Sequence, residues 1–150
     1  MKKFLTLLAV AVISVSATAG VTIQTQKKDY EAYVVNMELR PIFVFHSLTY
    51  GSYDLVVYSD NEFESTKARI DLGTSVEEAI ESLQNLADAC DLVNGDFKID
   101  GYRCITTSRG GTIYLLNIGE LEYTAGDYCI PKKNLLSLIE KLKAGTPVEF

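Results

Sequence analysis

The sequence predicts an α+β fold in which two helices pack on antiparallel sheets. Apolar and alternating runs typical of strands recur between turn residues over most of the chain, and two segments repeat apolar residues at helical spacing. Short turns join the strand-like runs, which suits antiparallel neighbours. The chain has 150 residues, of which 47% are hydrophobic, so it can form one ordinary core, and a multidomain enzyme is excluded.

The first half of the chain predicts five strands. Residues 42–48 are apolar on both faces, with Ile42 and Val44 on one side and Phe43 and Phe45 on the other, which is typical of a central, covered strand. The predicted strands of this half are residues 21–26, 31–39, 42–48, 55–59 and 63–72.

A helix follows with a clear start. Ser75 and Glu78 form a capping box. In this motif the serine hydroxyl accepts a hydrogen bond from the amide of residue 78, and the glutamate side chain accepts one from the amide of residue 75. Apolar residues then recur at intervals of three and four up to about Cys90. One face of this helix is therefore expected to cover a sheet.

The second half repeats this order of elements. Asp100 and Gly101 join two strand-like runs in the pattern of a two-residue type I′ hairpin. Pro131 opens a second helix, because its ring is tolerated in the first helical turn, and Gly145 ends that helix. The predicted strands of this half are residues 97–99, 102–107, 112–118 and 121–130.

The two helices share a phase, which suggests a tandem ββββα pseudo-repeat with halves at residues 20–91 and 92–150. Leu83 and Ile139 are 56 positions apart, yet identity at this offset is nearly absent. The order of elements resembles that of Whirly-type single-stranded-DNA-binding proteins. The tandem of sheet-plus-helix units resembles the secreted beta-lactamase inhibitory proteins, although those place helices before strands. No residue motif of either family is matched.

Residues 1–19 are predicted to be a secretory signal peptide. Two lysines precede the apolar run of residues 4–15, and small residues before position 20 mark a cleavage site. The run is about twelve residues, too short to span a bilayer. The alternative is a buried N-terminal strand or helix. We expect residues 20–150 to form a single secreted or periplasmic domain without an integral membrane segment.

The expected mature chain is acidic. Without the two lysines of the signal peptide, 12 basic residues face 20 acidic ones, a net charge of −8. Binding to nucleic acid or to anionic lipid needs a positive face, so both are disfavoured. A protein is the expected partner. A glycan stays open, although glycan sites usually rely on tryptophan, which the chain lacks.

Three cysteines would meet an oxidising compartment after export. Cys90 extends the apolar stripe of the first helix, which predicts a small buried thiol. Cys104 and Cys129 lie on predicted strands and are the expected disulfide pair. No C-x-x-C spacing occurs, so neither a redox site nor a zinc site is indicated.

No catalytic, metal or cofactor motif stands out. His46 is the only histidine, and the adjacent Ser47 points to the opposite face of the strand, so we expect a structural histidine. Carboxylate pairs could in principle act in hydrolysis, but a solvated face is the simpler interpretation. The pairs are Glu62 with Glu64 and Glu120 with Glu122.

Two features favour binding. Residues 108–111 carry two glycines and Arg109, which could surround an anion, although a hairpin loop is the simpler interpretation. The chain also has nine tyrosines, of which Tyr50 and Tyr53 flank a turn of small residues where they can face a partner.

We therefore expect an exported, non-enzymatic binding module that presents Tyr50, Tyr53 and Arg109, together with sheet surface, to a protein or a glycan. The alternatives are a small hydrolase that uses carboxylates on the sheet, and a structural component of an envelope assembly. A deep pocket that joins two carboxylates would favour the hydrolase, whereas a flat exposed tyrosine or apolar patch would favour binding.

Overall fold

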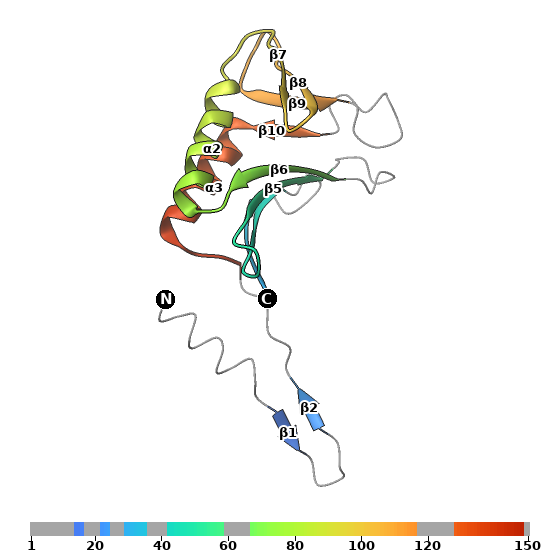
Figure 1. Cartoon of the computed structure of the whole chain (residues 1–150). Coiled ribbons are helices and arrows are strands. Elements are labelled where there is room, and N and C mark those ends of the chain that lie inside the picture. Colours follow the sequence, from blue (N-terminus) through green and yellow to red (C-terminus); the bar gives the residue numbers. More distant parts are fainter. Residues whose placement is uncertain are drawn as a thin grey trace.

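The computed structural model describes residues 14–16, 22–24, 29–35, 42–58, 67–116 and 128–148. The predicted α+β class is confirmed: two four-stranded antiparallel sheets and two helices form a visible ββββα repeat. Both helices lie on the same side of the two sheets (Figure 1).

The first sheet has the order β3-β4-β5-β6, so β4 is an interior strand, as predicted. Alternation along the strands decides which side chains face the helices. Ile42 and Val44 of β4 point with Leu55 of β5 into the core, whereas Phe43 and Phe45 point away from it. The strands are β3 (Tyr30–Val35), β4 (Ile42–Ser47), β5 (Tyr53–Tyr58) and β6 (Lys67–Gly73).

The first helix, α2 (Val76–Ala89), begins where the capping box predicts. Ser75 Oγ accepts a hydrogen bond from the Glu78 amide at 3.1 Å. Gly73 turns the chain from β6 into the helix with a φ of +113°, and a Cβ at this position would lie 2.6 Å from the Cβ of Glu78. The junction therefore requires a glycine.

The second sheet has the order β10-β9-β8-β7. The β7–β8 hairpin turns at Asp100 and Gly101, whose φ values of 48° and 82° fit the predicted type I′ turn. The second helix, α3 (Lys132–Ala144), begins after Pro131, and Gly145 ends it in the left-handed conformation. The strands are β7 (Asp96–Ile99), β8 (Tyr102–Ile105), β9 (Thr112–Leu116) and β10 (Cys129–Pro131).

The two halves share one core. α3 contacts β3 and β4 of the first sheet, and α2 packs against α3. Leu83 of α2 and Leu138 of α3 are fully buried in a cluster that continues into the second sheet at Ile113. Positions related by the offset of the pseudo-repeat are mostly buried in pairs, but Ile80 is half-buried where its counterpart Leu136 is 40% exposed.

A separate two-stranded sheet overlaps the predicted signal peptide. β1 (Ser14–Ser16) pairs antiparallel with β2 (Thr22–Gln24), which falls within the strand predicted at residues 21–26. Residues 1–13 and 17–21 lie outside the described residues, and cleavage of the signal peptide stays a prediction. In the part of the chain that the structure describes, neither helix is long and apolar enough to cross a membrane.

The predicted disulfide between Cys104 and Cys129 is not formed, which corrects that prediction, and all three cysteines are thiols. Cys104 on β8 pairs with Leu115, and Cys129 on β10 pairs with Tyr114, so β9 separates the two cysteines and they point to opposite faces of the sheet. Cys90 is a buried thiol at the end of α2, as predicted, and burial raises its pKa to about 11.

Candidate functional site

The face of the first sheet that points away from the helices carries four half-buried aromatic rings, termed here the aromatic face. Tyr30 and Phe45 stack with their ring centroids 5.1 Å apart, and Phe43 and Tyr58 stack at 5.9 Å. Phe43 and Phe45 are two positions apart on β4 and therefore share this face. The sequence predicts that this strand is covered on both faces, but among the described residues the helices pack only on the face of Ile42 and Val44.

Two cations of β6 lie over the aromatic face. The guanidinium carbon of Arg69 is 5.2 Å from the ring centroid of Phe45, and its Nη2 donates to Asp54 Oδ2 at 3.1 Å. Lys67 Nζ is 5.8 Å from the ring centroid of Tyr58. Cation–π contacts of this kind hold ring and cation together. The aromatic face thus combines apolar area with positioned positive charge.

The two tyrosines singled out in the sequence have opposite environments. Tyr50 is 84% exposed at the turn between β4 and β5, and its amide donates to Ser47 Oγ at 3.1 Å. Tyr53 is the first residue of β5 and is only 8% exposed, on the side that faces the helices. The turn therefore brings Tyr50 to the surface and Tyr53 into the core.

His46 has a partner that the sequence analysis missed. Glu31 of β3 is its cross-strand neighbour, and Glu31 Oε1 lies 3.2 Å from His46 Nδ1. On the other side, the imidazole stacks on Tyr53 with ring centroids 3.9 Å apart and an interplanar angle of 6°. Strand register is the signal that could have revealed this pair in the sequence. A hairpin that pairs Val35 with Ile42 also pairs Glu31 with His46.

Burial keeps the phenol of Tyr53, which stacks on this histidine, and the phenol of Tyr33 neutral. Burial raises the pKa of Tyr33 to about 12, and the Glu31 carboxylate adds to the rise. Burial also raises the pKa of Tyr53, with smaller contributions from Glu31 and Glu77.

The Glu31–His46 pair is a carboxylate–imidazole pair, a type that can accept or donate a proton. However, no three side chains of the metal-binding types gather anywhere among the described residues, so this pair has no further ligand to hold a metal.

Arg109 lies at the exposed tip of the connection between β8 and β9. The Gly110 amide donates to the Thr107 carbonyl at 3.2 Å, and the Gly111 amide donates to the Cys90 carbonyl at 2.7 Å. Both glycine amides therefore bind carbonyl groups and do not form an anion cradle. The loop is a hairpin connection, and Arg109 remains as an exposed cation.

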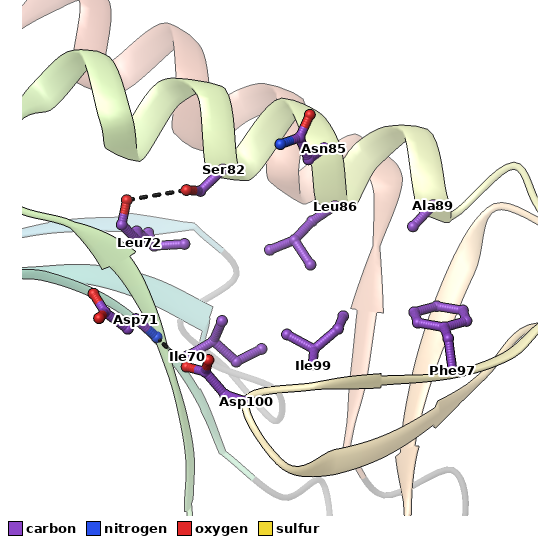
Figure 2. Close-up of a pocket in the computed structure, with 10 residues that line it drawn as sticks. All are labelled: Ile70, Asp71, Leu72, Ser82, Asn85, Leu86, Ala89, Phe97, Ile99 and Asp100. Atoms are coloured by element: carbon purple, nitrogen blue, oxygen red, sulfur yellow. Dashed lines mark hydrogen bonds between the residues drawn. The ribbon is translucent and has the colours of Figure 1, made fainter.

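A groove lies between the two sheets beneath α2, and it is termed the inter-sheet groove (Figure 2). Its volume is about 300 Å³. Leu86 points into it from α2, while Ile70 of β6 and Ile99 of β7 point toward the helix (Figure 2). The residues that line it are Ile70, Asp71, Leu72, Ser82, Asn85, Leu86, Ala89, Phe97, Ile99 and Asp100.

Two carboxylates lie at the mouth of the inter-sheet groove, and each binds a backbone amide. Asp100 Oδ2 accepts from the Asp71 amide at 2.7 Å, and Asp71 Oδ1 accepts from the Gly73 amide at 2.9 Å. These oxygens cap the edge of β6, which is a structural use. The other carboxylate pairs considered for hydrolysis, Glu62 with Glu64 and Glu120 with Glu122, lie outside the described residues.

Comparison with known proteins gives no match: neither a protein-family model, nor a curated protein, nor a solved structure matches the chain. The described residues present four candidate sites. These are the aromatic face with the Tyr50 turn, the Glu31–His46 pair, the Arg109 loop and the inter-sheet groove.

Proposed function

We propose that the protein is an exported, non-enzymatic binding module that recognises another protein through the aromatic face and the Tyr50 turn. The observation that supports this proposal is the set of four aromatic rings on a sheet face without a described helix, held by stacking and by two cations. Aromatic side chains supply large contact area at low cost in side-chain entropy, and together with arginine they dominate interface hot spots.

A protein is preferred to a glycan as the partner. Sugar-binding sites usually rely on tryptophan, which the chain lacks. The aromatic face mixes apolar rings with Arg69 and Lys67, and protein interfaces have this mixed composition. Tyr50, at one end of the same sheet, adds an exposed ring to the contact.

Two alternatives predict different outcomes. A carboxylate hydrolase would use the two aspartates at the inter-sheet groove, and replacing either of them by asparagine would abolish turnover. A structural component of an envelope assembly would instead associate through many copies and elute as a large particle. The binding module predicts neither turnover nor large particles, but capture of a distinct protein.

Capture of a partner from the exported fraction of cells tests the proposal. Tyr50→Ala removes an exposed ring, and Phe45→Ala removes a ring that stacks on Tyr30. We expect each change to weaken capture by about 1–3 kcal/mol if the ring is an anchor. The matched control is Tyr114→Ala, because Tyr114 is a half-buried aromatic residue of the second sheet.

Circular dichroism first establishes that each variant is folded. Capture that is unchanged by both Tyr50→Ala and Phe45→Ala would contradict the proposal. Capture that is lost with Tyr114→Ala would move the contact to the second sheet.

A further inference from the structure

The outward edge of β6 offers little main chain to a partner. Three amides in its C-terminal part, those of Arg69, Asp71 and Gly73, are bound by side-chain oxygens. They donate in turn to the Tyr102 hydroxyl at 3.3 Å, to Asp100 Oδ2 at 2.7 Å and to Asp71 Oδ1 at 2.9 Å. A partner strand cannot pair with these amides while the β7–β8 hairpin is in place. Beside the hairpin, recognition therefore has to use side chains.

The inter-sheet groove beside this edge suits one apolar side chain. Its volume of about 300 Å³ is at the lower end of the range for ligand pockets. Its apolar walls come from three elements and include Ile70, Leu86 and Ile99 (Figure 2). The Ser82 hydroxyl on the roof already donates to the Leu72 carbonyl at 3.0 Å. The walls thus favour an apolar occupant over a polar one.

The charge around the groove is negative. Asp71 and Asp100 are exposed at its mouth, and α2, which forms its roof, contains four acidic residues and no basic one. Arg69 and Arg103 on the neighbouring strands are paired with carboxylates at 3.1 and 2.8 Å. Lys98 alternates with the lining residues of β7, so it points to the other face of its sheet. Positive charge on an occupant would therefore be complementary to the rim.

We infer that the inter-sheet groove is a second interaction site, which takes a large aliphatic side chain from a partner-protein segment in which lysine or arginine flanks that residue. The apolar walls hold the anchor, and the acidic rim attracts the flanking cations and sets the orientation of the segment. This site rests on the proposed function only in that the partner is a protein, because the groove and the aromatic face are made by different side chains.

A short peptide tests the site directly. The probe is an acetylated and amidated pentapeptide with a central leucine between two lysines on each side, titrated into the full chain and followed by methyl NMR. We expect saturable shifts of the methyl groups of Ile70, Leu86 and Ile99, with the methyl groups of Ile42 in the first sheet unchanged. Two matched peptides, one with serine at the centre and one with glutamate flanks, should produce no saturable shift.

Variants of the groove distinguish the contribution of the acidic rim to peptide binding from the contribution of the cavity itself. The double change Asp71→Asn with Asp100→Asn keeps both acceptor oxygens, and asparagine tolerates the φ of 48° at residue 100. It should weaken binding roughly threefold to tenfold at low salt. Asp29→Asn, just before the opposite edge strand β3, is the matched control and should leave the affinity unchanged. Ala89→Leu places a side chain in the groove and should abolish the shifts.

The inference is overturned if the lysine-flanked peptide shifts none of the groove methyl groups, if the glutamate-flanked peptide binds as tightly, or if Ala89→Leu binds like the unmodified chain. If the peptide does not bind while partner capture is intact, the groove site alone is overturned. Intact methyl shifts together with capture that ignores both Tyr50→Ala and Phe45→Ala overturn the aromatic face alone.

Discussion

The two sheets have the same number of strands, and both helices lie on the same side of them, yet their other faces differ. The first sheet presents the aromatic face, whereas the second presents an ion pair in which Arg103 donates to both carboxylate oxygens of Asp96, at 3.2 and 2.8 Å. The hydrogen bond from Arg103 holds the pKa of Asp96 below its ordinary value. One backbone arrangement therefore carries two chemically distinct surfaces.

The helices of the two halves differ in the same way. α2 has a side-chain cap at Ser75 and ends at Cys90 in the right-handed helical conformation, whereas α3 begins after Pro131 without a side-chain cap and ends at a left-handed Gly145. A side-chain cap therefore defines the start of the helix in the first half, and a left-handed glycine defines the end of the helix in the second half. The halves are thus equivalent in topology but not in local sequence.

The largest expected effect tests whether the two halves form one folding unit. Leu83→Ala on α2 and Leu138→Ala on α3 each leave a cavity at a fully buried position, so each should lower the free energy of unfolding by about 2–5 kcal/mol. Urea unfolding followed by circular dichroism measures this change. Because α3 contacts the first sheet, we expect one transition in both variants. Two separate transitions would show that the halves unfold independently.

A smaller effect compares the two glycines that bound the helices. Gly73→Ala should lower the free energy of unfolding by about 1–3 kcal/mol, because it combines a positive φ with a contact of 2.6 Å to the Cβ of Glu78. Gly145→Ala has open space for its Cβ and should cost only about 1 kcal/mol for the left-handed backbone. Thermal unfolding of both variants ranks them, and an equal or reversed order would contradict this account of the junction.

The cap of α2 gives the next effect in size. Ser75→Ala removes the acceptor of the Glu78 amide and should lower the free energy of unfolding by about 1 kcal/mol. Ser108→Ala in the exposed loop is the control and should change nothing measurable. A Ser75→Ala variant as stable as the unmodified chain would mean that packing alone fixes the start of α2.

The smallest expected effect is a pH dependence of the free energy of unfolding, which is absent at neutral pH and develops at alkaline pH. Burial raises the pKa of Cys90 and Cys104 from 9.0 to about 11 and that of Tyr33 from 10.0 to about 12. In the unfolded chain these groups ionise at their ordinary, lower values, so the stabilisation is complete below about pH 9 and is lost as the pH rises toward the folded values. Urea unfolding at increasing pH should show this fall, and Cys90→Ala should reduce it. Stability that rises with pH in this range would contradict the prediction.

Local patterns predicted the start of α2 and the β7–β8 hairpin, but not β1, which lies within the predicted signal peptide. Ser75 with Glu78, and Asp100 with Gly101, each act on a backbone only a few residues long. The helix start and the hairpin turn therefore followed from short segments of sequence. The helical period likewise predicted the buried face that α2 turns toward the sheets.

Contacts between distant segments could not be predicted in this way. Whether Cys104 can reach Cys129 depends on the order of the strands and on the face to which each residue points. Only the assembled sheet places β9 between the two cysteines. Tyr53 is buried because β5 begins at that residue, a boundary that the turn residues leave undecided. The inter-sheet groove belongs to three elements at once and has no signature in any one of them.

The tip of the β7–β8 hairpin also affects how copies of the chain behave toward one another. Edge strands with open amides are templates for aggregation, because another chain can extend the sheet. β6 has seven residues and is an edge strand of the first sheet, but Tyr102 and Asp100 occupy its outward amides at Arg69 and Asp71. The hairpin therefore covers this part of the edge, where another chain cannot pair with the amides of Arg69 and Asp71.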